Sequence, residues 1–129
     1  ESRHARRMLT KSEDKSILDH DIESLDVVSL SSYCHRKKIT HIDILKIDTQ
    51  STELEVLDGA RDILPMVKMI YMEISFWDLY QTRSSFFEVE SRIRPSNSVL
   101  KDLTRITRDA VGTNWVEAIY INEDYIKLE

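Results

Sequence analysis

Two apolar runs separated by a polar, helix-like segment dominate the middle of the chain. The first run, HIDILKID, is almost continuously apolar over residues 42–47 and ends at Asp48. The second lies in VKMIYMEISF, covers residues 67–74 and has an acid, Glu73, at its carboxyl end. Such runs are typical of strands buried on both faces, as in parallel sheets with helices packed on each side. The sequence therefore predicts two central strands.

The segment between these runs, ELEVLDGARDIL, has the periodicity of an amphipathic helix. Its apolar positions recur every three or four residues, at Leu54, Leu57, Ala60 and Leu64. Thr52 is the expected N-cap, and Pro65 is expected to end the helix. A strand, a helix and a second strand in this order predict a βαβ unit with parallel strands and a right-handed connection. The expected fold class is a doubly wound α/β sheet.

The flanking segments predict further elements. Residues 26–30, DVVSL, predict a strand, and SSYCHRKK predicts a short helix capped by Ser31 or Ser32. Beyond the central unit, SSFFEVESRIR predicts a helix that stops at Pro95. Two alternating runs, VLKDLTRIT and WVEAIYIN, are joined through a turn at Gly112 and predict an antiparallel pair at the edge of the sheet.

Charge and length narrow the class of protein. The 129 residues suit one folded domain, and the formal net charge of −5 argues against a general nucleic-acid binder. Four basic residues gather only at the start of the chain, so we interpret residues 1–23 as a solvated polar arm and 24–129 as the domain. One cysteine, Cys34, leaves no intrachain disulfide framework. No apolar stretch reaches the ~20 residues of a membrane span, and we expect a soluble, cytoplasmic protein.

Candidate chemistry lies where the two central strands end, because open α/β sheets bind ligands beyond the carboxyl ends of their strands. Asp48, with Gln50 and Glu53 close behind it, is suited to hold a cation, accept a hydroxyl proton or bind an amino group. The alternative is a carboxylate that only caps the strand-to-helix turn. Glu73 precedes Phe76 and Trp77, which form either an aromatic pocket wall or ordinary core.

The histidines do not suggest a metal site. His35 and His41 have neither the helical pairing nor the neighbouring thiolates that make a metal centre convincing. Cys34 is adjacent to His35 in sequence, but consecutive helical residues do not face each other. We therefore expect no metal ion and no Cys–His nucleophile.

Residues 46–60, KIDTQSTELEVLDGA, closely resemble the signature of FkbM-type methyltransferases, usually KID-(V/T)-(E/Q)-G-x-E-x-x-V-L-x-G-A. The likeness continues over MIYMEISFWDLY and NWVEAIYIN, and with VVSLSSY upstream it covers residues 24–122. It implies the C-terminal half of a Rossmann-like class I methyltransferase sheet. Such an enzyme uses S-adenosylmethionine to methylate a hydroxyl of a sugar or small metabolite.

By the same resemblance, Asp48 and Glu53 are the expected catalytic residues, and Asp48, Gln50 and Glu73 are expected to bind the cofactor.

The sequence also departs from the family pattern. Ser51 occupies the position of the family's glycine, and Ser31 that of an acid. A glycine-rich turn after a first strand is not found, since the only glycines are Gly59 and Gly112.

Two hypotheses therefore stay open: a methyltransferase completed by a further segment or a partner, and a non-catalytic pseudoenzyme that acts as a structural or interaction subunit. Both predict an open sheet edge at residues 42–47 and hence a homo-oligomer or a partner protein that covers it.

Overall fold

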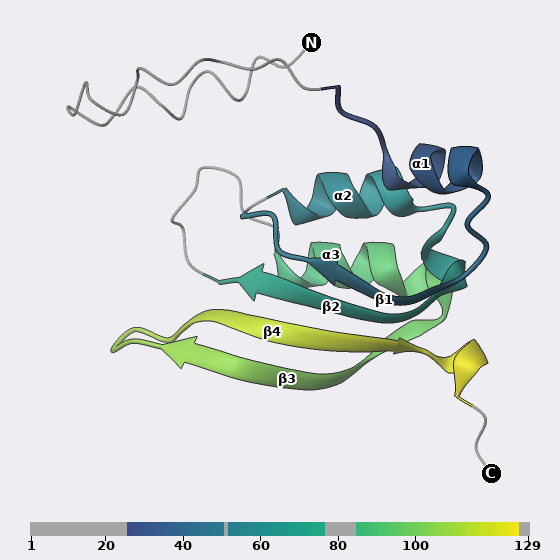
Figure 1. Ribbon diagram of the computed structural model, residues 1–129. Coiled ribbons are helices and arrows are strands. Elements are labelled where there is room, and N and C mark those ends of the chain that lie inside the picture. The colour runs from purple at the N-terminus through teal and green to yellow at the C-terminus, as the bar shows by residue number, and fades with distance from the viewer. Residues whose placement is uncertain (1–25, 51, 77–84, 127–129) are drawn as a thin grey trace, which may run out of the picture.

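A four-stranded sheet with helices packed against it makes up the part of the chain that the computed structural model describes, residues 26–50, 52–76 and 85–126 (Figure 1). The helices and strands follow one another as α1 (Leu30–Lys37), β1 (Ile42–Ile47), α2 (Glu53–Ala60), β2 (Val67–Ser75), α3 (Phe86–Ile93), β3 (Ser98–Arg108) and β4 (Thr113–Asn122). In the described ranges, three short 3-10 helices accompany them: η4 (Leu64–Met66), η5 (Arg94–Ser96) and η6 (Glu123–Tyr125). The fold is mixed α/β, as the sequence predicts.

The strands lie in the order β1-β2-β4-β3. β1 and β2 are parallel, with Ile47 opposite Met72, and α2 connects them. β4 is antiparallel to both of its neighbours, β2 and β3. The predicted βαβ unit and the antiparallel pair at the far edge of the sheet are therefore confirmed.

The core lies between one face of this sheet and the three helices, which all cover the same side (Figure 1). Alternate residues of β2 and β4 point into it because successive side chains of a strand face opposite ways. The strand side chains of the core that are almost fully inaccessible are Ile47, Val67, Ile70, Met72, Ile74, Val116, Ala118 and Tyr120. The helices contribute Cys34, Leu57, Ala60, Val89 and Ile93 to the same cluster. Helix packing thus fixes the relative positions of β1 and β2.

The opposite face of the sheet is only partly covered by the described residues. Met69 and Tyr71 of β2 and Ile119 of β4 are half-buried there, and Ile44 of β1 is 60% exposed. Within these residues β1 pairs only with β2, so the predicted open edge is confirmed for the described part of the chain. Among the described residues β1 is not buried on both faces as expected, because the described helices pack against one face of the sheet alone.

The strand expected over residues 26–30 does not form. Ser29 caps α1 instead: its hydroxyl oxygen accepts a hydrogen bond from the Ser32 backbone N–H at 3.1 Å, so the helix begins at Leu30. The two valines before it face solvent, with Val27 94% and Val28 50% exposed. The cap expected at Ser31 or Ser32 is therefore also wrong, because a Ser two or three positions earlier satisfies the first free N–H groups.

α3 begins and ends close to its predicted position. α2 ends at Ala60, before the predicted end at Leu64, and Pro65 lies inside the 3-10 helix η4, so the expectation that Pro65 ends this helix is wrong. Thr52 precedes α2 as expected, but its hydroxyl donates to the Thr49 carbonyl at 3.1 Å and makes no cap to the helix. The N-cap of α3 is Ser85, which forms a reciprocal capping box with Glu88. α3 ends at Ile93, before Pro95, as predicted.

Candidate active site

The carboxyl ends of β1 and β2 bring Asp48 and Glu73 together. Asp48 directly follows β1, and Glu73 lies inside β2, which continues to Ser75. Since Ile47 is opposite Met72 in the parallel register, the residues that follow them are neighbours at this end of the sheet. The sequence places Glu73 at the end of its strand, but the structure places it before the last two residues.

Gln50 joins the two carboxylates. Its amide nitrogen Nε2 lies 3.3 Å from Asp48 Oδ1 and 3.3 Å from Glu73 Oε1, and donates a hydrogen bond to each. The backbone of Gln50 is left-handed, with φ of 53°, a conformation uncommon outside glycine and asparagine. This turn directs the amide back across the strand ends. Ser51, where the family has glycine, lies outside the described residues.

Lys46 completes the surroundings of Asp48. Its Nζ lies 3.1 Å from Asp48 Oδ2, so each carboxylate oxygen of Asp48 has a donor of its own. The sequence reasoning did not select Lys46, although a signal was present. Residues two apart on a strand face the same side, and Lys46 stands two positions before Asp48.

The surroundings push the two carboxyl groups in opposite directions. Hydrogen bonds from Lys46 and then Gln50 lower the pKa of Asp48 below its ordinary value. Partial burial, followed by the negative charge of Asp48, raises the pKa of Glu73. A pair of acids separated in this way is the usual arrangement in which one stays ionised and the other exchanges a proton.

Glu53 stands at the start of α2, close enough for its charge to contribute to the raised pKa of Glu73. Its side chain is buried, at 7% exposed, and accepts a hydrogen bond from the Thr49 hydroxyl at 3.3 Å. The helix dipole is positive at the first turn of α2, and there it stabilises the negative charge of the Glu53 carboxylate. All four residues selected from the sequence, Asp48, Gln50, Glu53 and Glu73, are therefore gathered in one cluster.

The aromatic part of the expected pocket is described only in part. Phe76 is 39% exposed and stacks on Phe86 at a centroid distance of 6.5 Å, which ties the end of β2 to α3. Trp77 lies outside the described residues. In the described ranges no three His, Cys, Asp or Glu side chains are arranged to hold a metal ion, and His41 is paired with Asp43 at 3.0 Å.

None of the helices in the described part of the chain is long and apolar enough to cross a membrane.

A parallel strand pair with two carboxylates at its carboxyl end defines an α/β protein with a candidate ligand site. The family described as Methyltransferase FkbM domain matches residues 3–100, which is most of the chain. The chain therefore belongs to the FkbM methyltransferase family, and the resemblance found in the signature around Asp48 is confirmed. Neither the curated proteins nor the solved structures contain a match to this chain.

Proposed function

We propose that this chain forms the C-terminal half of a Rossmann-like class I methyltransferase domain that transfers a methyl group from S-adenosylmethionine to a hydroxyl of a sugar or small metabolite. The observation that carries the proposal is the Gln50 bridge, which holds Asp48 and Glu73 together at the carboxyl edge of the parallel strands. Ligands of open α/β sheets bind at this edge. The family match supports the same assignment.

The charge of the cluster fits the cationic part of this cofactor. Three carboxylates, on Asp48, Glu53 and Glu73, face one ammonium group, on Lys46. An excess of negative charge attracts the amino group and the sulfonium of S-adenosylmethionine. When bound, the cofactor supplies an electrophilic methyl group on its sulfonium sulfur. Asp48 and Gln50 are the residues that we expect to hold it.

The cluster does not provide a glycine cradle. The two glycines of the chain lie in α2, at Gly59, and in the hairpin connection between β3 and β4, at Gly112. Neither belongs to the strand ends that carry Asp48 and Glu73. The remaining part of the cofactor site must therefore come from other residues, in this polypeptide or in a partner.

Glu73 is the group best suited to take the proton from a hydroxyl acceptor. A base works best when its pKa approaches the working pH, and the pKa of Glu73 is raised while that of Asp48 is lowered. Asp48 stays ionised and keeps its electrostatic role. Glu53, buried behind the cluster, holds the Thr49 hydroxyl at the turn.

Calorimetric titration of the full chain with S-adenosylmethionine and with its demethylated product tests this proposal. We expect binding that Asp48→Ala weakens by about tenfold or more, the loss of one charge-assisted contact. Glu73→Gln is the companion variant, and it should keep most of the binding but lose methyl transfer to an acceptor. A folded chain that binds neither compound would contradict cofactor binding by this chain.

The second candidate function is a non-catalytic module of a larger assembly, and it predicts that the folded chain binds neither compound. The observation that favours it is the open edge of β1, which pairs only with β2 among the described residues and carries the exposed side chain of Ile44. Unpaired edges recruit strands from other chains. We propose that a second copy of the chain or a partner protein covers this edge. Sedimentation of the chain and of Ile44→Lys should then show association that the substitution weakens.

A further inference from the structure

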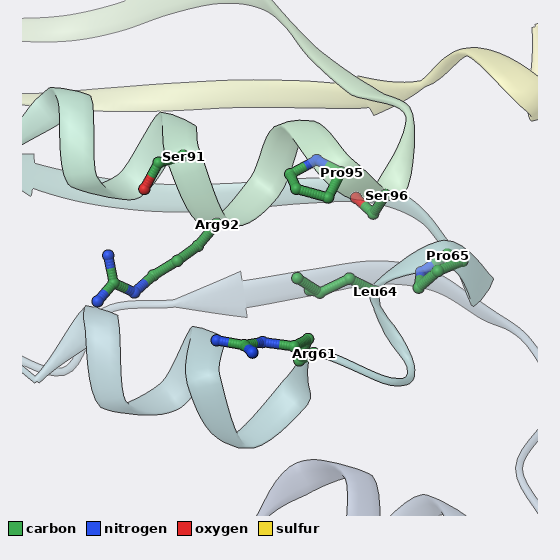
Figure 2. A pocket seen from close by; sticks show the side chains of 7 residues that line it. All are labelled: Arg61, Leu64, Pro65, Ser91, Arg92, Pro95 and Ser96. Atoms are coloured by element: carbon green, nitrogen blue, oxygen red, sulfur yellow. The ribbon is translucent and has the colours of Figure 1, made fainter.

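A pocket lies away from the Asp48 cluster, between α2 and α3 (Figure 2). It has a volume of about 300 Å³ and begins where α2 ends, at Arg61. The Asp48 cluster lies at the opposite end of α2, beside Glu53. A helix of this length separates the two places by about 12 Å. The pocket is therefore distinct from the proposed methyltransferase site.

Two arginines form the charged end of this pocket. Arg61 Nη2 and Arg92 Nε donate to the same oxygen, Asp58 Oδ1, at 3.2 and 3.1 Å. Arg92 Nη1 also donates to the Glu88 carbonyl at 3.2 Å, which holds the guanidinium against α3. Two guanidinium groups and one carboxylate leave the trio with an excess of one positive charge. Since each guanidinium carries five N–H donors, both can take a further oxygen.

Asp58 is strongly engaged by these arginines. Although partial burial acts in the other direction, hydrogen bonds from Arg92 and Arg61 hold its pKa below the ordinary value. The carboxylate thus occupies a position that suits an oxyanion. It is the internal competitor of any anionic ligand that approaches the same two guanidinium groups.

The remainder of the pocket is mainly apolar. Leu64, Pro65 and Pro95 line it, and Figure 2 shows these side chains beyond the two arginines along the gap between the helices. The hydroxyl of Ser91 donates to the Glu88 carbonyl at 2.7 Å, and that of Ser96 to the Ile93 carbonyl at 2.7 Å. Both serine oxygens are consequently already oriented. Pockets with an apolar lining and a few fixed polar groups are typical of small-molecule sites.

We propose that this pocket binds a small organic oxyanion, a carboxylate or a phosphate monoester carried on a compact apolar body. Arg92 is the anchor, because its side chain is 28% exposed and held by α3, whereas Arg61 at 75% exposed closes over the ligand from α2. Guanidinium groups bind such oxyanions through paired hydrogen bonds. The apolar body lies against Leu64 and the two prolines.

Asp58 distinguishes an oxyanion site from a groove that binds its ligand through apolar contact alone. If an oxyanion competes with Asp58 for the arginines, Asp58→Asn frees both guanidinium groups and strengthens binding. We expect Asp58→Asn to bind at least threefold more tightly. A groove that binds through apolar contact alone shows no such gain.

Titration of the full chain with phenyl phosphate and, separately, with benzoate, followed by backbone amide NMR, tests the site. We expect shifts that concentrate at Arg61, Ser91 and Arg92, and Arg92→Gln should weaken binding by about tenfold. Arg108→Gln, on β3, is the matched control and should leave the affinity unchanged. Benzyl alcohol, which has the ring without the charge, should bind at least tenfold more weakly than benzoate.

The two probes distinguish a phosphate site from a carboxylate site, since the anion that binds more tightly carries the group that the pocket prefers. The proposal is wrong if Arg92→Gln binds as well as the parent chain, or if Asp58→Asn does not gain affinity. Circular dichroism and thermal unfolding of each variant establish that it is folded. Shifts confined to the Asp48 cluster would also overturn the proposal.

Discussion

The carboxylates of Asp48 and Glu73 share one amide donor, the Nε2 of Gln50, which lies 3.3 Å from each. The two carboxylates have different surroundings although they share this donor. Asp48 also accepts a hydrogen bond from Lys46, whereas Glu73 is partly buried and lies close to two other acids, Asp48 and Glu53. A cluster built in this way stores repulsion between like charges. Sites arranged for binding or proton transfer commonly reduce stability in this manner.

Glu73→Gln should therefore stabilise the fold at neutral pH. The pKa of Glu73 is raised in the folded chain, so ionisation favours the unfolded state above the ordinary value of 4.5. The amide removes this penalty, and after screening by solvent we expect a gain between a few tenths and about 1 kcal/mol. Urea unfolding at neutral pH measures it. The gain should disappear as the pH falls below the ordinary value, where both states are protonated.

Asp48→Asn is the matched control with the opposite sign. The pKa of Asp48 is lowered in the fold, so its carboxylate contributes stability above the ordinary value of 3.8, and this stability is lost as the pH falls through the folded pKa. Replacing it should lower the free energy of unfolding slightly at neutral pH. Equal gains from both variants would show that the two carboxylates are not differentiated by their surroundings.

Local sequence was sufficient for the central unit of the fold. The apolar runs at residues 42–47 and 67–74 form β1 and β2, and Pro95 follows the end of α3 as expected. The cluster was predicted for the same reason, since parallel strands bring the residues at their carboxyl ends together. These runs do not predict how the sheet is covered, because an apolar run does not reveal how many faces of its strand meet helices.

The remaining differences arise from a local hydrogen bond in one case and from contacts between separate segments in another. At residues 26–30 the β-branched pattern was outweighed by one hydrogen bond, from the Ser32 N–H to the Ser29 hydroxyl, which begins α1. Gln50 was selected for its place between Asp48 and Glu53, but its left-handed backbone was not foreseen because that conformation depends on the turn as a whole. The Arg61–Asp58–Arg92 contact joins two helices, and such contacts leave no periodic signal.

The unequal coverage of β1 leads to a second prediction. Ile47 is almost fully buried beneath the helices, whereas Ile44 of the same strand is 60% exposed. Ile47→Ala removes buried methyl groups and leaves a cavity, and should lower the free energy of unfolding by about 2–5 kcal/mol. Ile44→Ala is the matched control and should cost less than about 1 kcal/mol. Denaturant unfolding of both variants at low protein concentration makes the comparison.

A large loss for Ile44→Ala that grows with protein concentration would show instead that the open edge is covered by a second chain in solution. Such a dependence follows from mass action, because association stabilises only the folded state.

The capping box of α3 gives a third prediction. The Ser85 hydroxyl oxygen accepts from the Glu88 N–H at 3.2 Å, and Glu88 Oε2 accepts from the Ser85 N–H at 3.1 Å. Ser85→Ala removes the first of these contacts and should lower stability by about 1 kcal/mol. Ser91→Ala, in the body of the same helix, should change stability by less than about 0.5 kcal/mol. Thermal unfolding distinguishes them, and equal shifts would show that the cap contributes nothing specific.

The last prediction concerns a hydroxyl in the core. Tyr120 is fully buried, and its hydroxyl lies close to the Glu90 carboxylate without a hydrogen bond of normal geometry among the described residues. Burial, followed by the negative charge of Glu90, raises the pKa of this phenol well above its ordinary value. Tyr120→Phe keeps the ring and removes the unpaired polar atom, so at neutral pH stability should be unchanged or should rise by up to about 1 kcal/mol.

The difference between Tyr120→Phe and the parent chain should widen in alkali. Above pH 10.0, the ordinary value, the unfolded parent chain ionises this tyrosine while the folded chain does not, so unfolding is favoured by up to about 1.4 kcal/mol per pH unit. The phenylalanine variant lacks this contribution. Urea midpoints measured between pH 8 and about pH 11 test the sign. A parallel decline of the two proteins would mean that the Tyr120 hydroxyl ionises as readily in the fold as in the unfolded chain.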